Sequence, residues 1–172
     1  MIYILIYGAL AMLFLWTEHH RKLLNMPVSE QAEVWFEWMN HAALHYELQQ
    51  WQEAIPNLGC AFDLSCQSLL CEAADHNPQE QKNIATQLTL AAIYLANAYQ
   101  HYKGYDKAQF VLAKALRALH LSGVAGLSDS ADWAQECTQI LLHQERHEDY
   151  FERYLNLPFA CCKQRAFALH LH

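Results

Sequence analysis

The chain has 172 residues, of which 53% are hydrophobic and 17% are charged, while five are Gly and four are Pro. This length fits one domain, the apolar fraction is too high for a disordered chain, and the shortage of turn residues argues against a many-stranded sandwich or barrel. The formal net charge of −7 includes no continuous basic stripe, so we expect no nucleic-acid partner. The composition therefore predicts an all-α fold.

Residues 2–16 form an apolar run without a charged or strongly polar side chain. As a helix this run would span about 22 Å, which is short of the roughly 30 Å hydrocarbon core of a bilayer. Aromatic residues lie near both of its ends, and Arg21 and Lys22 follow it, as the positive-inside rule expects on the cytoplasmic side. We favour a membrane anchor over a helix buried in protein.

We predict that residues 1–24 comprise the apolar N-terminal helix with its basic flank, and that residues 25–172 form the helical domain. Insertion of residues 2–16 would hold the protein at a bacterial-like inner membrane, facing the cytoplasm. The six cysteines agree with a reducing compartment, because they form no CxxC pair and no disulfide-framework spacing. The alternatives are a cytoplasmic protein with a buried helix and a soluble homo-oligomer with this helix in the subunit interface.

Two segments in the middle of the chain, 41–54 and 95–108, align without gaps. Both have Ala at the second and fourteenth positions, a bulky residue at the eighth and an aromatic residue at the eleventh. Both continue with Leu four residues later and Ala three residues after that, which forms one narrow helical face. The copies are 54 residues apart, with an insertion around 66–78.

This pattern resembles the tetratricopeptide repeat, a helical hairpin whose small residues allow two helices to approach closely. The matching residues are Leu95, Ala96, Tyr99, Gly104, Tyr105, Ala108, Leu112 and Ala115 in the second copy, and Trp38, Ala42, Trp51, Ala54, Leu58 and Ala61 in the first. Gly104 supplies the turn in this alignment, whereas His41 and His45 stand where Leu and Tyr are usual. The resemblance implies an array of antiparallel helical hairpins, with a looser third hairpin over 133–157 that turns near 145–147.

Capping and turn residues divide this array into helices. They predict one helix over 29–49, capped by Ser29, and another that begins at Asn77 with Glu80 completing a capping box. The stretch 122–129 is predicted as a loop, and a last helix is predicted from Phe159 to about residue 169.

Eleven histidines invite a metal or acid–base interpretation. Glu37, His41 and His45 share one helix face at intervals of four residues, and His143 and His147 form a second pair. Neither set has the ligand pattern of a metalloprotease or a di-iron bundle, and no nucleophile or phosphate-binding motif occurs. We therefore predict no metal, no cofactor and no catalytic residue, and no role is assigned to the adjacent cysteines 161 and 162. A metal-binding bundle or an enzyme that uses Glu37, His41 and His45 is the alternative.

Charge alternates along the chain. No Lys or Arg occurs from Leu23 to Gln81, where nine acidic residues lie, whereas residues 82–128 are mainly basic and residues 129–153 are acidic again. The acidic residues of the first hairpin either line a negative groove for a basic or polar peptide or complement the basic second hairpin.

The predicted function is therefore a non-enzymatic scaffold or adaptor for protein–protein interaction. In the family that the chain resembles, a partner peptide docks in a groove lined by the first helix of each hairpin. The groove candidates are Glu37, Trp38, His41, His45, Asn97 and His101.

Overall fold

The structure is a computed structural model that describes residues 14–15, 17–71, 76–125, 128–155, 157 and 159–160. Within these ranges the chain forms seven α-helices and one short 3-10 helix, and no strand. The helices are α2 (Thr17–Leu24), α3 (Val28–Glu47), α4 (Trp51–Leu70), α5 (Pro78–His101), α6 (Tyr105–Ala125), α7 (Ser128–Leu142) and α8 (His147–Tyr154), with the 3-10 helix η1 at Gln144–Arg146. The predicted all-α class is confirmed.

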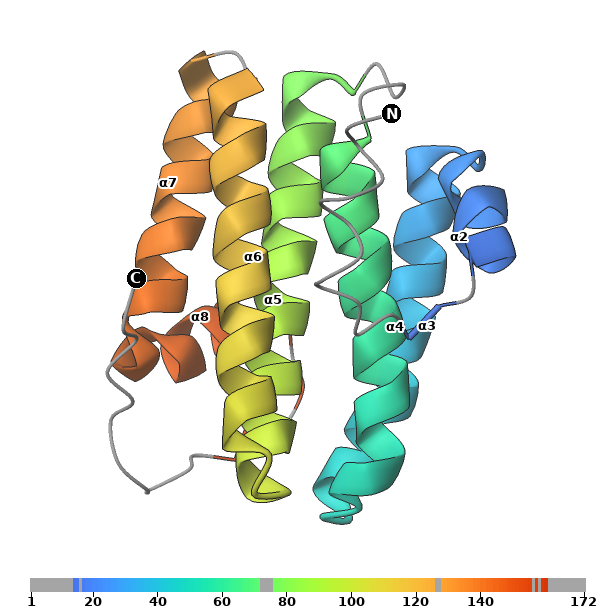
Figure 1. The fold of residues 1–172 in the computed structure, drawn as a ribbon, viewed down its shortest axis with the longest axis vertical. Helices are drawn as coiled ribbons and strands as arrows, with labels where there is room; N and C mark the ends of the chain where they lie inside the picture. Colours follow the sequence, from blue (N-terminus) through green and yellow to red (C-terminus); the bar gives the residue numbers. More distant parts are fainter. Residues whose placement is uncertain are drawn as a thin grey trace.

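Helices α3 to α7 stand side by side in antiparallel order, with each packed against the next in sequence (Figure 1). The short helix α2 packs against α4 at one edge, and α8 lies against α5 and α7 near the opposite edge. The described part of the chain therefore folds as successive helical hairpins, α3–α4 and α5–α6, followed by α7, η1 and α8. The turn of this last unit falls where the sequence predicts it.

Helix α5 forms the centre of the packing. Every residue from Leu88 to Tyr99 is buried, because α4, α6 and α7 all pack against this helix. Four alanines in this stretch keep the helix surface flat enough for three neighbours to approach. The predicted capping box fixes its first turn, since Asn77 Oδ1 accepts the Glu80 N–H at 2.9 Å and Glu80 Oε2 accepts the Asn77 N–H at 3.0 Å.

The two hairpin turns have the same backbone geometry. Gln49 and Lys103, which are 54 residues apart like the two repeat copies, both adopt left-handed conformations with φ of 58° and 61°. The Gln50 N–H donates to the His45 carbonyl at 2.8 Å, and the Gly104 N–H donates to the Tyr99 carbonyl at 2.7 Å. The two hairpin turns, at equivalent positions of the two aligned segments, therefore share one backbone geometry.

Gly104 lies in the second hairpin turn, as the sequence predicts, but it is not the left-handed residue of that turn. The left-handed residue of the second turn is Lys103, whereas Gly104 has no positive φ. Gly104 instead provides space, because a Cβ at this position would lie 3.2 Å from Cδ1 of Tyr99.

The predicted cap of the first long helix is wrong, since α3 begins at Val28 with Pro27 as its N-cap and no side-chain cap. The predicted loop over 122–129 is shorter than expected, because α6 continues to Ala125 and α7 begins at Ser128.

Both predicted terminal helices fall largely outside the described residues. Of the apolar run 2–16, only Phe14 and Leu15 are described, and neither is helical. Across the described ranges, none of the helices has both the length and the apolar character needed to span a bilayer. Of the predicted last helix 159–169, only Phe159 and Ala160 are described, and these two residues are not helical.

The short N-terminal stretch packs on the second-helix side of the first hairpin. Phe14 lies against Gly59 of α4, where a Cβ would overlap the Phe14 ring. The Phe14 N–H donates to Asp63 Oδ2 at 2.5 Å, and the other carboxylate oxygen of Asp63 is 3.0 Å from Nζ of Lys114 on α6. This buried ion pair therefore connects the acidic first hairpin with the basic second hairpin.

Candidate functional site

Two features lie along the seam between α3 and α5, the first helices of the first two hairpins. At one end, Tyr46 of α3 contacts Asn97 of α5. At the other end, Phe36 of α3 and Gln87 of α5 line one pocket. Each pair is separated by 51 residues, so the two helices run parallel in constant register along this seam.

The first feature is a polar cluster of Tyr46, Asn97 and His101 that holds the main chain of Ala160. The Tyr46 hydroxyl donates to Asn97 Oδ1 and accepts the Ala160 N–H at 3.2 Å. Asn97 Nδ2 donates to the Ala160 carbonyl at 3.1 Å, and His101 Nε2 lies 3.2 Å from the same oxygen. The ring donates in the tautomer that carries its proton on Nε2. Both hydrogen-bonding groups of one residue are thus bound by side chains from two helices.

Aromatic rings surround this polar cluster. The Trp51 ring stacks on His101 with ring centroids 4.3 Å apart, and Tyr46 meets Trp51 edge-on at 4.8 Å. Phe159, which precedes the bound residue, lies 5.3 Å from Phe151 of α8. These contacts leave the hydrogen bonds to Ala160 partly buried.

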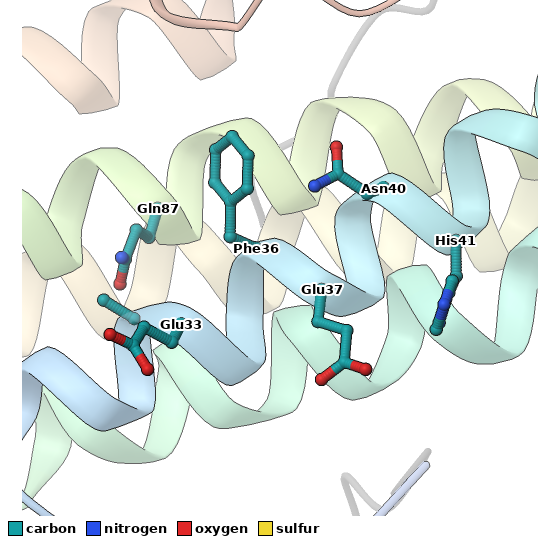
Figure 2. A pocket seen from close by; sticks show the side chains of 7 residues that line it. Glu33, Phe36, Glu37, Asn40, His41 and Gln87 are labelled. Carbon is teal, nitrogen blue, oxygen red and sulfur yellow. The ribbon is translucent and has the colours of Figure 1, made fainter.

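The second feature is an open pocket of about 590 Å³ at the other end of the seam. Figure 2 shows Phe36 and Asn40 on the side of α3 towards α5, and Glu37 and His41 on the side towards α4. Phe36 is 47% exposed although its ring is large and apolar. The pocket therefore offers an apolar floor with carboxylates beside it.

The structure separates the six residues predicted from the sequence into four groups. Asn97 and His101 meet at the Ala160 main chain, whereas Glu37 and His41 line the open pocket. His45 is turned to the hairpin loop, where its Nδ1 lies 2.9 Å from Oε1 of Gln50. Trp38 is half-buried and packs against the core.

Sequence reasoning missed Tyr46 and Ala160. Tyr46 follows Ala42 by four residues on the same face of α3, so helical spacing places it beside the α5 helix. No comparable signal exists for Ala160, because its position depends on the path of the chain after α8.

The metal alternative needs ligands that converge. Among the described residues, no three His, Cys, Asp or Glu side chains are placed to share a metal ion. Glu37 and His41 face the pocket, while His45 faces Gln50. The described part of the chain therefore offers no arrangement for the Glu37, His41 and His45 ligand set.

The described cysteines are free thiols: Cys60, Cys66, Cys71 and Cys137. Burial, with a smaller contribution from the Asp63 carboxylate, raises the pKa of Cys60 to about 11. Burial also raises the pKa of Cys66 to about 11. Both remain protonated at neutral pH, and a protonated thiol is a poor nucleophile and metal ligand. Cysteines 161 and 162 lie outside the described residues.

Comparison of the chain with protein-family models, with curated proteins and with solved structures gives no match. A functional assignment therefore depends on the geometry of the seam itself.

Proposed function

We propose that this chain is a non-enzymatic scaffold of tetratricopeptide type that binds an extended peptide segment along the seam between α3 and α5. The observation that carries the proposal is the capture of the Ala160 main chain by Tyr46, Asn97 and His101. These side chains bind one residue through its main-chain N–H and C=O and not through its side chain.

Main-chain recognition of this kind suits a peptide ligand. Hydrogen bonds to the main chain provide affinity that does not depend on sequence, and neighbouring pockets then select particular side chains. Asn97 is buried, so leaving its amide without a partner would cost free energy. The Ala160 seat, which is formed by Tyr46, Asn97 and His101, is therefore suited to a main chain. The aromatic rings around it favour an apolar residue beside the bound main chain.

The family resemblance supports the same interpretation. In that family the groove is lined by the first helix of each hairpin, and here both helices of the seam are first helices. Asn97 occupies a groove-lining position of the second copy, whereas the equivalent position of the first copy is Ala43. Tyr46 of the first copy supplies the second polar contact instead.

The experiment is a selection of peptides from a random displayed library with the full-length chain, followed by affinity measurements on purified variants. Asn97 also holds the chain's own Ala160, so Asn97→Ala is compared with wild-type Asn97 in a Phe159→Ala background, where that segment is held less tightly. Asn97→Ala removes the donor to the peptide carbonyl, and we expect it to weaken the binding of the selected peptides by about tenfold or more. The matched control is Asn83→Ala, because Asn83 lies exposed on the same helix and its side chain accepts a hydrogen bond from Gln79, away from Ala160. Peptides that bind equally tightly with and without Asn97→Ala in the Phe159→Ala background would contradict the proposal, and so would a selection that yields none.

A second variant tests competition with the bound segment of the chain itself. Phe159→Ala removes the ring that packs on Phe151 and so weakens the hold on Ala160. Because a tethered segment competes at a high effective concentration, weakening it should tighten the binding of an added peptide. Unchanged peptide affinity in this variant would show that the Ala160 seat and the peptide site are different.

A further inference from the structure

The outward face of α3 carries a row of exposed apolar side chains. Phe36 is 47% exposed, Leu44 is 62% exposed and Leu48, at the end of the helix, is 68% exposed. At about 100° per residue these three positions fall within an arc of roughly 120°, so they form one stripe along α3, with exposed Asn40 between Phe36 and Leu44. Side chains of this size on one solvent-facing stripe mark an interaction surface.

Carboxylates accompany this stripe. Glu33, Glu37 and Glu47 are all exposed and lie in the same arc of α3. None of the ion pairs in the described ranges involves an acidic residue of α3. Neither α3 nor α4 contains a Lys or an Arg. The negative charge beside the apolar stripe is therefore not neutralised by the hairpin that carries it.

We propose that this face of α3 binds an amphipathic helix of a partner protein, with apolar residues on the Phe36–Leu44–Leu48 stripe and Lys or Arg residues beside Glu33, Glu37 and Glu47. An exposed helical stripe is complementary to the apolar face of another helix. The unpaired carboxylates select a basic partner, because like charges brought together at an interface are unfavourable.

The same charges disfavour other occupants. A second copy of the chain in a symmetric dimer would place the same acidic stripe on both sides of the contact. An anionic lipid surface and a nucleic acid would both be repelled by it. A basic helix satisfies both the apolar and the charged part of the face.

This surface includes Glu33, Phe36 and Glu37 of the pocket at one end of the seam, but it includes no residue that binds Ala160, so this proposal and main-chain binding at Ala160 can fail separately. The probe is a synthetic helix of about 16 residues with Leu on one face and Lys on the other, and its matched control has Glu in place of Lys. We expect the full-length chain to bind the Lys helix about tenfold more tightly than the Glu helix in fluorescence anisotropy. Equal binding of the two probes would overturn the proposal.

Variants locate the binding. Phe36→Ser with Leu44→Ser should weaken the Lys helix by about tenfold, and the exposure of both residues leaves the core intact. Leu121→Ser is the matched control, since Leu121 is a similarly exposed apolar residue on α6. The Asn97→Ala variant should bind the Lys helix with the same affinity as the wild-type chain. An equal loss in the Leu121 control would overturn the proposal, as would amide chemical-shift changes that map away from α3.

Sedimentation of the chain alone tests the remaining occupant. We expect Phe36→Ser with Leu44→Ser to leave the mass in solution unchanged. A dimer that dissociates in this variant would assign the face to a second copy of the chain and overturn the proposal.

Discussion

Replacement of Lys114 by Met tests the ion pair that joins the two hairpins. The Asp63 side chain is 0% exposed and that of Lys114 is 15% exposed, with 3.0 Å between Nζ and Oδ1. Met keeps most of the aliphatic length of Lys114 but removes the charged Nζ, which also lies 5.2 Å from the centroid of the Phe62 ring. Breaking a buried pair costs about 3–5 kcal/mol, and we expect the lower end, because Asp63 keeps the Phe14 N–H.

The assay is urea unfolding, monitored by tryptophan fluorescence and by circular dichroism. A loss of about 3 kcal/mol corresponds to a fall of roughly 6–12 °C in melting temperature for a chain of this size. Arg117→Met is the matched control, because Arg117 is exposed one turn further along α6. It should stay within about 0.5 kcal/mol of the wild-type chain.

A double variant separates a buried charge from ordinary packing. Asp63→Leu with Lys114→Met removes both charges, and we expect it to recover most of the stability lost in Lys114→Met. If Lys114→Met were as stable as the Arg117 control, or if its cost were the same in the Asp63→Leu background, the pair would not couple the hairpins.

Three further predictions concern single positions. Burial lowers the pKa of His147, so the unfolded chain takes up its proton first and stability should fall below about pH 6.5 by up to ~1.4 kcal/mol per pH unit. His147→Leu should reduce this slope in urea titrations at several pH values, and an unchanged slope would contradict the assignment. Asn77→Ala should cost about 1 kcal/mol through loss of the cap on α5, measured against Gln79→Ala. Gly59→Ala should destabilise by about 1–3 kcal/mol because of the Phe14 ring, but should stabilise by up to ~1 kcal/mol in a Phe14→Ala background. A loss of equal size in both backgrounds would exclude that contact as the cause.

Local signals account for what the sequence predicted of the fold. The capping box of Asn77 and Glu80 involves residues three apart, and both of its hydrogen bonds are present. The repeated hairpin turn is likewise local, and Gln49 and Lys103 take the same conformation at equivalent positions. Helix periods and turn positions therefore follow from residues that are neighbours along the chain.

The polar seat could not be predicted from local patterns. Tyr46 and Ala160 are 114 residues apart, and their hydrogen bond depends on how the chain returns after α8. Asn97 was a candidate because of its place in the repeat, but its partner is a main chain that no side-chain pattern reveals. Trp38 was also a groove candidate, but it packs against the core. An aromatic residue on a first helix can do either, so its residue type alone does not decide between the two.

The acidic residues of the first hairpin differ in burial between its two helices. Asp63 of α4 is buried and complements Lys114 of the basic hairpin, so its contribution is to stability. The acids of α3 are exposed, and no ion pair in the described ranges includes them. Neutralising exposed, unpaired carboxylates changes stability little, because water already solvates them. Glu33→Gln with Glu37→Gln should therefore leave the unfolding free energy almost unchanged while it weakens the binding of a basic partner. Lys114→Met should instead lower the unfolding free energy and leave that binding unchanged.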